Sequence, residues 1–522
     1  MTDLAVPTST ESPTRWISLA GTCTAAGLVW LAFADLGVAI PTIADELHAD
    51  LSALQWANNA FSLVTGALVI AAGKFGDLFG RRRMLLIGIA LFAGFSVIGA
   101  TADDVATLVI GRGLMGVGAA LILPATLAVI PPQFSGKAQL TAFGVWQAVA
   151  WGGQAIGPAI GGAITDGPGW AWLFWINIPL GIAAYLVVAR FTPESSDADA
   201  SRSVDWPGLI TIGLAVFALL YALTDGPSVG WDDPLIVGLL VLAVVLAGTW
   251  LVIERRVGEP LVDLRLFRLR PYDGALTANL TMNLAFAGLS YLLVLWLQNA
   301  RGYSAIEAGM LMLPSTIGIF AFIPFGGRLS QRRGGRVPVL IGLVLMALGF
   351  FVVGQLDVDS TLILLAAGLV VIGLGLGLLS TPISNTAVGE VPKELAGTAA
   401  GVFKMSSMVG GALGVAVLSA IARGATTHDT EVAATAAGMT PDEIDRARQA
   451  LVQSESFSDA VSRLPTDLAQ KVSVAATDAF THGVAQSMVI TGVLALVATA
   501  VVAALWPRSA ATTDPHPIVE PT

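Results

Sequence analysis

Long apolar runs recur from one end of this chain to the other, and they constrain its fold more than any other feature. Each run is long enough to cross roughly 30 Å of hydrocarbon as a helix. They lie at about 16–40, 55–72, 84–101, 105–130, 138–164, 172–191, 206–225, 234–253, 273–298, 306–327, 337–354, 361–382, 396–422 and 484–506. Lipid offers no partners to unpaired backbone groups, so we predict an all-α integral membrane protein with fourteen transmembrane helices.

The composition of the chain supports this prediction. Hydrophobic residues make up 55% of the 522 residues, and charged residues only 12%. A soluble domain could not bury so much apolar surface, so most of it must face lipid. Because Cys23 is the only cysteine, intramolecular disulfides and cysteine-rich metal sites are excluded. All four histidines fall outside the apolar runs, which argues against haem, buried zinc or histidine catalysis, so no cofactor is expected.

The distribution of charge predicts which connections face the cytoplasm. Basic residues gather in alternate connections, as at Arg81–Arg83, Arg255–Arg256 and Arg332–Arg333. The other short connections are acidic, and Arg301 is their only basic residue. By the positive-inside rule the basic connections are cytoplasmic, and an even number of spans places both termini there as well. We therefore expect a multi-pass protein of the plasma membrane, and the excess of arginine over lysine suggests a bacterial source.

A basic, glycine-rich loop occurs twice and indicates an internal duplication. The first copy, Gly73–Arg83, reads GKFGDLFGRRR, and the second, Gly327–Arg336, reads GRLSQRRGGR. When their first residues are superposed, Gly80 falls on Gly334 and Arg82 on Arg336. The spans around these loops predict two six-helix pseudo-repeat bundles that flank two extra helices.

The predicted domain boundaries follow from the spans and the polar connections. They are a cytoplasmic tail (1–15), an N-terminal six-helix bundle (16–191), a cytoplasmic linker (192–205), the extra helix pair (206–253), a cytoplasmic loop (254–272), a C-terminal six-helix bundle (273–506) and a cytoplasmic tail (507–522). Within the C-terminal bundle, residues 423–482 are too polar to enter lipid and are predicted to form an extracellular loop. Thr440–Glu443 resembles a capping box that would open a helix there.

Two ionisable residues inside the spans are the candidates for proton coupling. Asp35 lies in the outer third of the first span, and an acid there costs about 2.5–3.5 kcal/mol to insert. Arg112 lies at a similar depth in the fourth span, where a guanidinium stays charged and needs a partner. We predict that Asp35 and Arg112 interact, directly or through water. The alternative is that Asp35 is simply an acid at the membrane interface.

The fifth span carries a stripe of glycines. Gly153, Gly157 and Gly161 recur every four residues and leave a groove along one face, against which another helix can pack closely. Pro158 removes one helix hydrogen bond and should bend the span, and Gly162 follows the stripe. Plain tight packing is the alternative to a packed surface that opens during function.

Polar and aromatic residues in or near the spans are candidates for a substrate cavity. Lys404 is the only lysine deep in a span, although it could also snorkel about 12 Å to the inner surface. For the others, contact with lipid or simple packing is an equal alternative. The candidates are Trp56, Asn59, Trp146, Gln147, Trp151, Asn279, Asn283, Trp296, Gln298 and Lys404.

Together these motifs resemble the major facilitator superfamily and, within it, the fourteen-span drug:proton antiporters. The first basic loop matches the signature loop of the superfamily in Gly73, Asp77, Gly80, Arg81 and Arg82. The stripe in the fifth span matches the antiporter motif in full, and Arg112, Gly116 and Gly118 match the motif of the fourth span. The first span departs from the family pattern, because the usual acid would stand at Ala32, one helical turn deeper than Asp35.

The resemblance implies a proton-coupled secondary active efflux transporter that exports amphipathic drugs or antibiotics by alternating access. Asp77, Arg81 and Arg82, with Gly73 and Gly80, would form a latch between the inner ends of the two halves in one state. The implied partners are a small amphipathic substrate, protons and the lipid bilayer, with no nucleic acid, and a monomer is expected.

Other functions remain open at this point. The same machinery could export an endogenous lipid or metabolite, since Lys404 suits an anionic group whereas Asp35 suits a cation. A membrane enzyme or sensor is disfavoured, because the sequence has no intramembrane histidine, nucleotide-binding loop or soluble output domain. Uptake is disfavoured by the complete antiporter motif.

Overall fold

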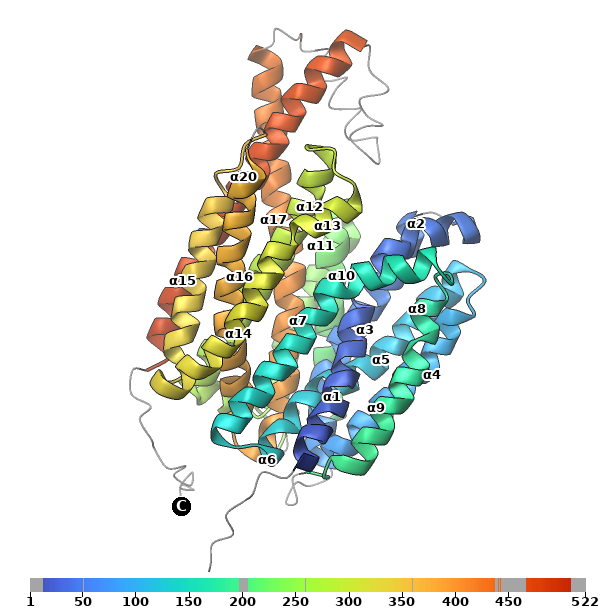
Figure 1. Cartoon of the computed structure of the whole chain (residues 1–522), viewed down its shortest axis with the longest axis vertical. Coiled ribbons are helices and arrows are strands. Elements are labelled where there is room, and N and C mark those ends of the chain that lie inside the picture. Colours follow the sequence, from blue (N-terminus) through green and yellow to red (C-terminus); the bar gives the residue numbers. More distant parts are fainter. Residues whose placement is uncertain are drawn as a thin grey trace, which may run out of the picture. The chain divides into compact units, whose positions relative to one another are not determined.

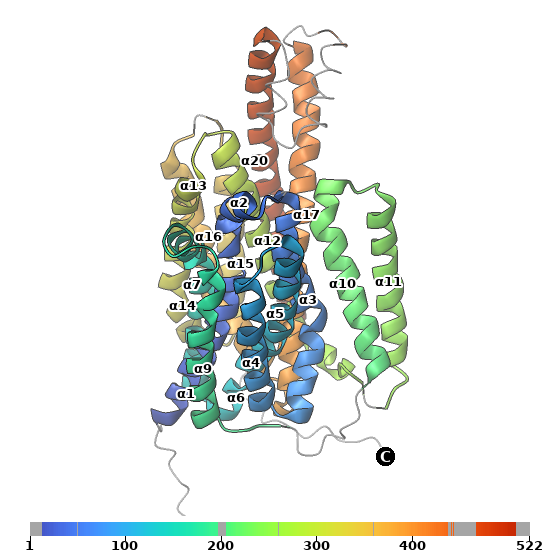
Figure 2. The same ribbon diagram turned by 90° about the vertical axis from the view of Figure 1, so that its right-hand side faces the viewer.

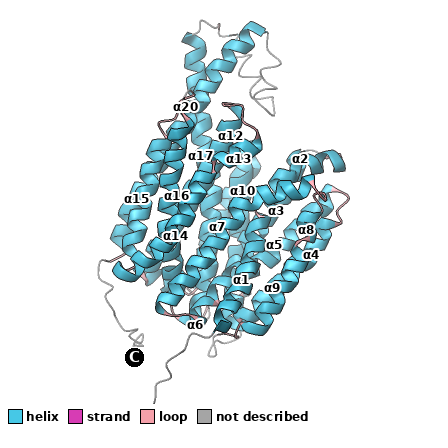
Figure 3. Cartoon of the chain, in the orientation of Figure 1, coloured by secondary structure: helices cyan, strands magenta, loops and turns pink. Residues whose placement is uncertain are grey.

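Every regular element in the described part of the chain is a helix (Figure 3). The computed structural model describes residues 13–49, 51–196, 205–258, 260–358, 360–436, 440, 442 and 466–507. For these residues the prediction of an all-α protein is confirmed. Several predicted features lie wholly or partly outside the described residues: most of the N-terminal tail, much of the linker, Pro441 and Glu443 of the candidate capping box, and nearly all of the C-terminal tail.

The helices follow one another along the chain with short connections (Figure 1). The first are α1 (Pro13–Ala32), α2 (Leu36–Leu47), α3 (Leu51–Phe79), α4 (Arg81–Ala100), α5 (Val105–Ala128), α6 (Ile130–Gln133), α7 (Gly136–Asp166), α8 (Trp172–Trp175) and α9 (Asn177–Phe191). Next come α10 (Trp206–Val229) and α11 (Pro234–Glu254), which Figure 2 shows as two long ribbons joined by a short turn. The rest are α12 (Arg270–Asn299), α13 (Ala305–Leu311), α14 (Leu313–Arg333), α15 (Arg336–Val353), α16 (Leu362–Ser384), α17 (Ala396–Ala436) and α20 (Thr466–Leu505).

Twelve of the described helical segments are long and apolar enough to cross a membrane, and a thirteenth results if α1 and α2 form one bent span. The protein is therefore a multi-pass membrane protein. Helix α7 coincides with the predicted span at 138–164 but is not among these segments, because glycines and glutamines dilute its apolar side chains. The figure of fourteen spans stays a prediction.

The first span is broken rather than continuous. The sequence predicts one helix over 16–40, but α1 ends at Ala32 and α2 begins at Leu36, with a bend of 51° between them. Hydropathy does not reveal this break, because the single acid Asp35 lies among apolar neighbours and barely lowers the mean hydropathy of the run.

Two helices extend beyond their predicted spans. Helix α17 continues to Ala436 and α20 already begins at Thr466, within the segment 423–482 that the sequence predicts as an extracellular loop. Polarity excludes this segment from lipid, but its many alanines favour helix.

The chain divides into two compact units. The first unit contains residues 1–221, 238–272 and 384–406, and the second contains 222–237, 273–383 and 407–522. In the first unit α5 packs against α3 and α4, while α1 packs against α7 and α9. In the second unit α15 packs against α14 and α20.

Glycines set the distance between α4 and α5. A Cβ atom on Gly118 would lie 2.6 Å from the backbone nitrogen of Phe92 and 2.8 Å from the carbonyl oxygen of Gly88. The second unit repeats this arrangement, since a Cβ on Gly342 of α15 would lie 2.8 Å from the carbonyl oxygen of Gly375 in α16. Both helix pairs therefore meet backbone to backbone, which requires small residues.

We expect Gly118→Ala to lower the thermal stability of the purified protein, because the added methyl group meets backbone atoms that cannot rotate away. Overpacking of this kind costs about 1–3 kcal/mol. The matched control is Gly113→Ala in the same helix, where the nearest atoms to a new Cβ lie 3.9 Å away. Thermal unfolding in detergent measures both variants, and equal midpoints would contradict the packing assigned to Gly118.

Candidate functional site

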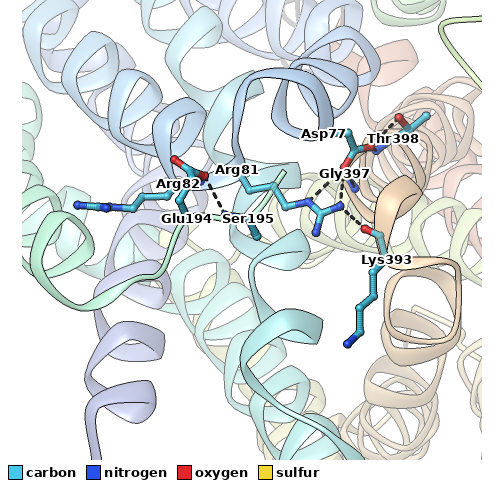
Figure 4. A network of polar contacts seen from close by, with 8 residues as sticks. All are labelled: Asp77, Arg81, Arg82, Glu194, Ser195, Lys393, Gly397 and Thr398. Carbon is cyan, nitrogen blue, oxygen red and sulfur yellow. Dashed lines mark hydrogen bonds and ion pairs between the residues drawn. The ribbon is translucent and has the colours of Figure 1, made fainter. Parts of the chain in front are cut away.

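Asp77 lies at the centre of a buried polar network between the end of α3 and the start of α17 (Figure 4). Its side chain is only 3% exposed. The carboxylate accepts hydrogen bonds from the backbone N–H groups of Gly397 (2.8 Å) and Thr398 (2.7 Å) and from the Thr398 hydroxyl (2.9 Å). Arg81 donates to the same carboxylate through Nε (3.1 Å) and Nη2 (2.7 Å), and also to the carbonyl of Lys393.

This position of Asp77 follows from the chemistry of a helix N-terminus. The first N–H groups of a helix have no partner within it and carry partial positive charge. Gly397 and Thr398 stand in the first turn of α17, so a carboxylate satisfies two of these donors at once. Gly73 allows the approach, since a Cβ there would collide with the carbonyl oxygen of Gly397.

Glu194 performs the same task at the start of α4, and the sequence analysis missed it. Its two carboxylate oxygens accept hydrogen bonds from the backbone N–H groups of Arg82 (3.1 Å) and Arg83 (3.2 Å), as Figure 4 shows in part. Gly80 makes room for it with a φ of +106°, and a Cβ there would lie 2.6 Å from Glu194. The available signal was a lone glutamate in the linker after the sixth predicted span, but nothing in the sequence connects it with Gly80.

The second copy of the loop has a similar backbone. Gly334, which aligns with Gly80, also has a positive φ, at +76°. Arg336 donates to the carbonyl of Ala503 in α20, and Arg82 donates to the carbonyl of Ala189 in α9. Each arginine thus binds the last predicted helix of its own half.

Arg112 lies beside the break between α1 and α2. It is 1% exposed, and its Nη2 donates to the carbonyl of Ala32 (2.8 Å) and to Asn58 Oδ1 (2.8 Å). Its guanidinium lies 4.5 Å from the ring centroid of Phe61. Ala32 is the last residue of α1, where the carbonyl lacks a helical partner and the helix dipole favours a cation. The sequence does not single out Asn58 as a partner of Arg112. Asn59, its neighbour, was predicted as a cavity residue instead, and nothing in the sequence distinguishes the two asparagines.

Asp35 is the N-cap residue of α2 and is 4% exposed. Arg112 binds the carbonyl of Ala32, three residues before Asp35, but the two side chains form no ion pair within 4.0 Å. A negative group at the start of α2 and a positive group at the end of α1 both match the dipoles of their helices.

The glycine stripe of α7 packs directly against this break. A Cβ on Gly157 would lie 2.5 Å from that of Ala34, and one on Gly161 would lie 2.5 Å from the carbonyl oxygen of Asp35. Further along, a Cβ on Gly153 would lie 3.0 Å from that of Trp30. A Cβ on Gly162, by contrast, would have its nearest neighbour 3.6 Å away, which is an ordinary contact. Pro158 lies inside α7, and the ribbon of this helix changes direction in its second half (Figure 1).

Lys404 is also in the first unit and lies among aromatic rings. It is 4% exposed, and its Nζ lies 4.3 Å from the ring centroid of Trp146 and 5.2 Å from those of Trp30 and Phe403. Trp146 is fully buried, and its indole nitrogen donates to Thr126 Oγ1 at 3.1 Å.

The other candidates for a cavity are divided between the two units. In the first unit Gln147 and Trp151 are buried, Asn59 is half-buried, and Trp56 packs against the ring of Tyr221 at 4.9 Å.

In the second unit Asn279 is buried and donates to Ser407 Oγ (2.8 Å), while Asn283 donates to the backbone carbonyl of Asn279 (2.8 Å). Trp296 is buried and donates to Thr481 Oγ1 (2.9 Å), and Gln298 is half-buried. The structure therefore brings Asn279 together with Asn283.

We expect Asp77→Asn to destabilise the protein by about 3–5 kcal/mol, the usual cost of leaving one partner of a buried ion pair unpaired. An amide also offers one acceptor oxygen where the two N–H groups of α17 need two. The control is Asp104→Asn at the exposed start of α5, where hydrogen bonds from Thr107 hold the pKa of Asp104 below its usual range. Asparagine caps a helix about as well as aspartate. Thermal unfolding in detergent should separate the two variants, and a similar loss in both would argue against the Asp77 network.

Comparison with known proteins places the chain in a family. The sequence pattern of the Major Facilitator Superfamily matches residues 19–415. The multidrug resistance protein Stp of Mycobacterium tuberculosis is 33% identical over 409 residues, which cover 78% of this chain and 76% of Stp. The tetracenomycin C resistance and export protein of Streptomyces glaucescens is 32% identical over 406 residues, with the same coverage of 78% and 76%.

The fold agrees with this assignment. The crystal structure of the human organic anion transporter MFSD10 superposes with a TM-score of 0.60 at 16% identity, over 94% of this chain and 100% of that one. At so low an identity the likeness concerns the fold alone. The sequence match over most of the chain is decisive: this chain belongs to the Major Facilitator Superfamily and is a membrane transporter, not an enzyme.

Proposed function

We propose that this protein exports small amphipathic drugs or antibiotics from a bacterial cell in exchange for protons, by alternating access. One observation carries the proposal: the break between α1 and α2 holds the buried Asp35 next to the helix end that Arg112 binds, and the glycines of α7 pack against the same break. Relatives whose names describe multidrug resistance and antibiotic export support the direction of transport.

Proton binding at Asp35 would change the stability of the break. The ionised carboxylate favours the start of α2, and it attracts the Arg112 guanidinium that caps the end of α1. Protonation removes both effects. A charge at a helix end is worth about 0.3–1 kcal/mol, and up to about 2 kcal/mol when partly buried. A change of 1–2 kcal/mol shifts an equilibrium by a factor of about 5–30, which is enough to favour a second conformation.

The Asp77 network would act as the latch of one state. It holds the first turn of α17 against the end of α3 through Asp77 and Arg81, and Glu194 holds the start of α4 beside it. In the other state these bonds would break, and water would replace them at the cytoplasmic surface. Gly73, Gly80 and Arg82 belong to the latch because they permit or extend these contacts.

The energy is sufficient for useful export. One charge moving through about 100 mV supplies about 2.3 kcal/mol. By the usual relation between free energy and concentration, this sustains a gradient of roughly fiftyfold.

The proposed architecture has fourteen spans in two six-helix halves around α10 and α11, with both termini in the cytoplasm and one chain as the working unit. The shared positive φ of Gly80 and Gly334 supports a duplication, as do the parallel contacts of Arg82 and Arg336. The polar and aromatic candidates of each unit would contact the substrate during transport. They are Trp56, Asn59, Gln147 and Trp151 in the first unit and Asn279, Asn283, Trp296 and Gln298 in the second.

Replacing Asp35 by asparagine should uncouple transport from protons. In everted vesicles with an imposed pH gradient, we expect tetracenomycin C to dissipate the gradient at least about tenfold more slowly in Asp35→Asn, because the amide cannot carry the proton. A pH-sensitive dye follows the gradient. Asp104→Asn, an acid outside the spans, is the control and should behave as wild type. Normal proton flux in Asp35→Asn would disprove the coupling role.

Gly161→Ala should slow transport, because the new methyl group would press on the backbone of Asp35 and hold α7 away from the break. Gly94→Ala, in α4, is the control, since nothing lies within 4 Å of a new Cβ there. We expect the initial rate of dye efflux per folded protein to fall at least about tenfold for Gly161→Ala only, a change of about 1.4 kcal/mol in the barrier. Equal rates in both variants would show that α7 does not move with the break.

A further inference from the structure

Lys404 occupies an aromatic cage in the first unit. Its ammonium lies 4.3 Å from the centroid of Trp146 and 5.2 Å from those of Trp30 and Phe403. Among the described side chains no carboxylate lies within 4.0 Å of its Nζ. Aromatic faces stabilise a cation without neutralising it. The cage therefore holds a buried amino group that no carboxylate of the described residues contacts directly, so an anionic ligand would supply the counter-charge that its protonated form lacks.

The cage is one end of a row of aromatic rings. The ring of Trp30 lies 5.6 Å from that of Phe33, and Phe33 lies 4.6 Å from Phe61. Arg112 stands on the far side of this row, 4.5 Å from Phe61. Trp30 and Phe33 are only half-buried.

One buried hydrogen-bond donor at this end has no acceptor among the described residues. Within the described residues, the indole N–H of Trp30 is buried without a partner, whereas that of Trp146 is satisfied by Thr126. Lys404 brings up to three further N–H donors. At the other end the Arg112 guanidinium already donates to Ala32 and Asn58. A buried donor of this kind needs an acceptor, and for Trp30 none comes from the described residues.

We propose that Lys404 and the indole N–H of Trp30 bind the anionic group of the transported molecule, whose aromatic body stacks on Trp30 and Phe33. The substrates are then aromatic acids, such as carboxylates or acidic phenols, rather than permanent cations. This inference rests on the proposed export function and specifies its substrate class. Cations are disfavoured at the Lys404 end, because no carboxylate of the described residues contacts the ammonium there.

Binding to the purified full-length protein tests this by isothermal titration calorimetry, with three matched probes. They are 2-naphthoate, uncharged 2-naphthamide and cationic (2-naphthylmethyl)trimethylammonium. We expect naphthoate to bind at least about tenfold more tightly than the other two, the usual gain from a charge-assisted hydrogen bond. Equal affinities, or preference for the cation, would overturn the proposal.

Variants identify the residues responsible. Lys404→Met keeps the length of the side chain and should remove the preference for naphthoate, whereas Lys404→Arg should retain it. Trp30→Phe keeps the ring but loses the N–H, and should weaken naphthoate binding severalfold without changing naphthamide binding. Lys137→Met, at an exposed lysine of α7, is the control. If Lys404→Met does not fold, unchanged naphthoate binding in Trp30→Phe, or equal probe affinities in wild type, still contradicts the site.

The binding site and the export function can fail independently of each other. If naphthoate binds through Lys404 but vesicles show no proton-coupled export of any probe, the binding site stands and the export proposal falls. If export is proton-coupled but insensitive to Lys404→Met and to the charge of the probe, export stands and this substrate class is wrong.

Discussion

Buried charges at helix ends are the interaction on which this structure depends. A charge inside a membrane protein is costly unless it finds complementary groups, and a helix end supplies them, because its terminal N–H or C=O groups have no partner within the helix. Asp77 accepts from the start of α17, Glu194 from the start of α4, and Arg112 donates to the end of α1. In each case one side chain joins two segments that are distant in sequence, so the charge also determines which segments pack together.

Glycines make these contacts possible. The charged groups reach a helix end only where backbones approach closely, as at Gly73 against Gly397 and at Gly80 beside Glu194. The same geometry brings Gly161 of α7 against the carbonyl oxygen of Asp35. A surface built from glycine and backbone has few interlocking side chains, so it can separate and reform with little repacking. This property suits a protein that is proposed to alternate between two conformations.

The first unit combines three chemical features that a proton-driven exporter would need. It has an acid at a helix break, a network that binds the start of α17, and a row of aromatic rings with a caged lysine at one end. The acid and the lysine are separate groups, so proton binding and substrate recognition can be assigned to different residues. The glycine stripe of α7 contacts Asp35 at Gly161 and Trp30, which belongs to the lysine cage, at Gly153. A movement of α1 against α7 would therefore change the surroundings of both the acid and the lysine.

The sequence by itself determined that the chain is helical and crosses a membrane, because the length and hydropathy of each run are local properties. It also pointed to Arg112 and the glycine stripe, since their residue types are costly or unusual inside a span, and to Asp77, which matches the signature loop of the superfamily. Only the tertiary structure decided what these residues contact. The break after Ala32 and the partner of Asp77, 320 residues away at Gly397, depend on backbone groups at helix ends, whereas the choice of Asn58 over Asn59 depends on where the Arg112 side chain lies. Such groups are the same in every residue, so no sequence pattern marks the ones that are left unpaired.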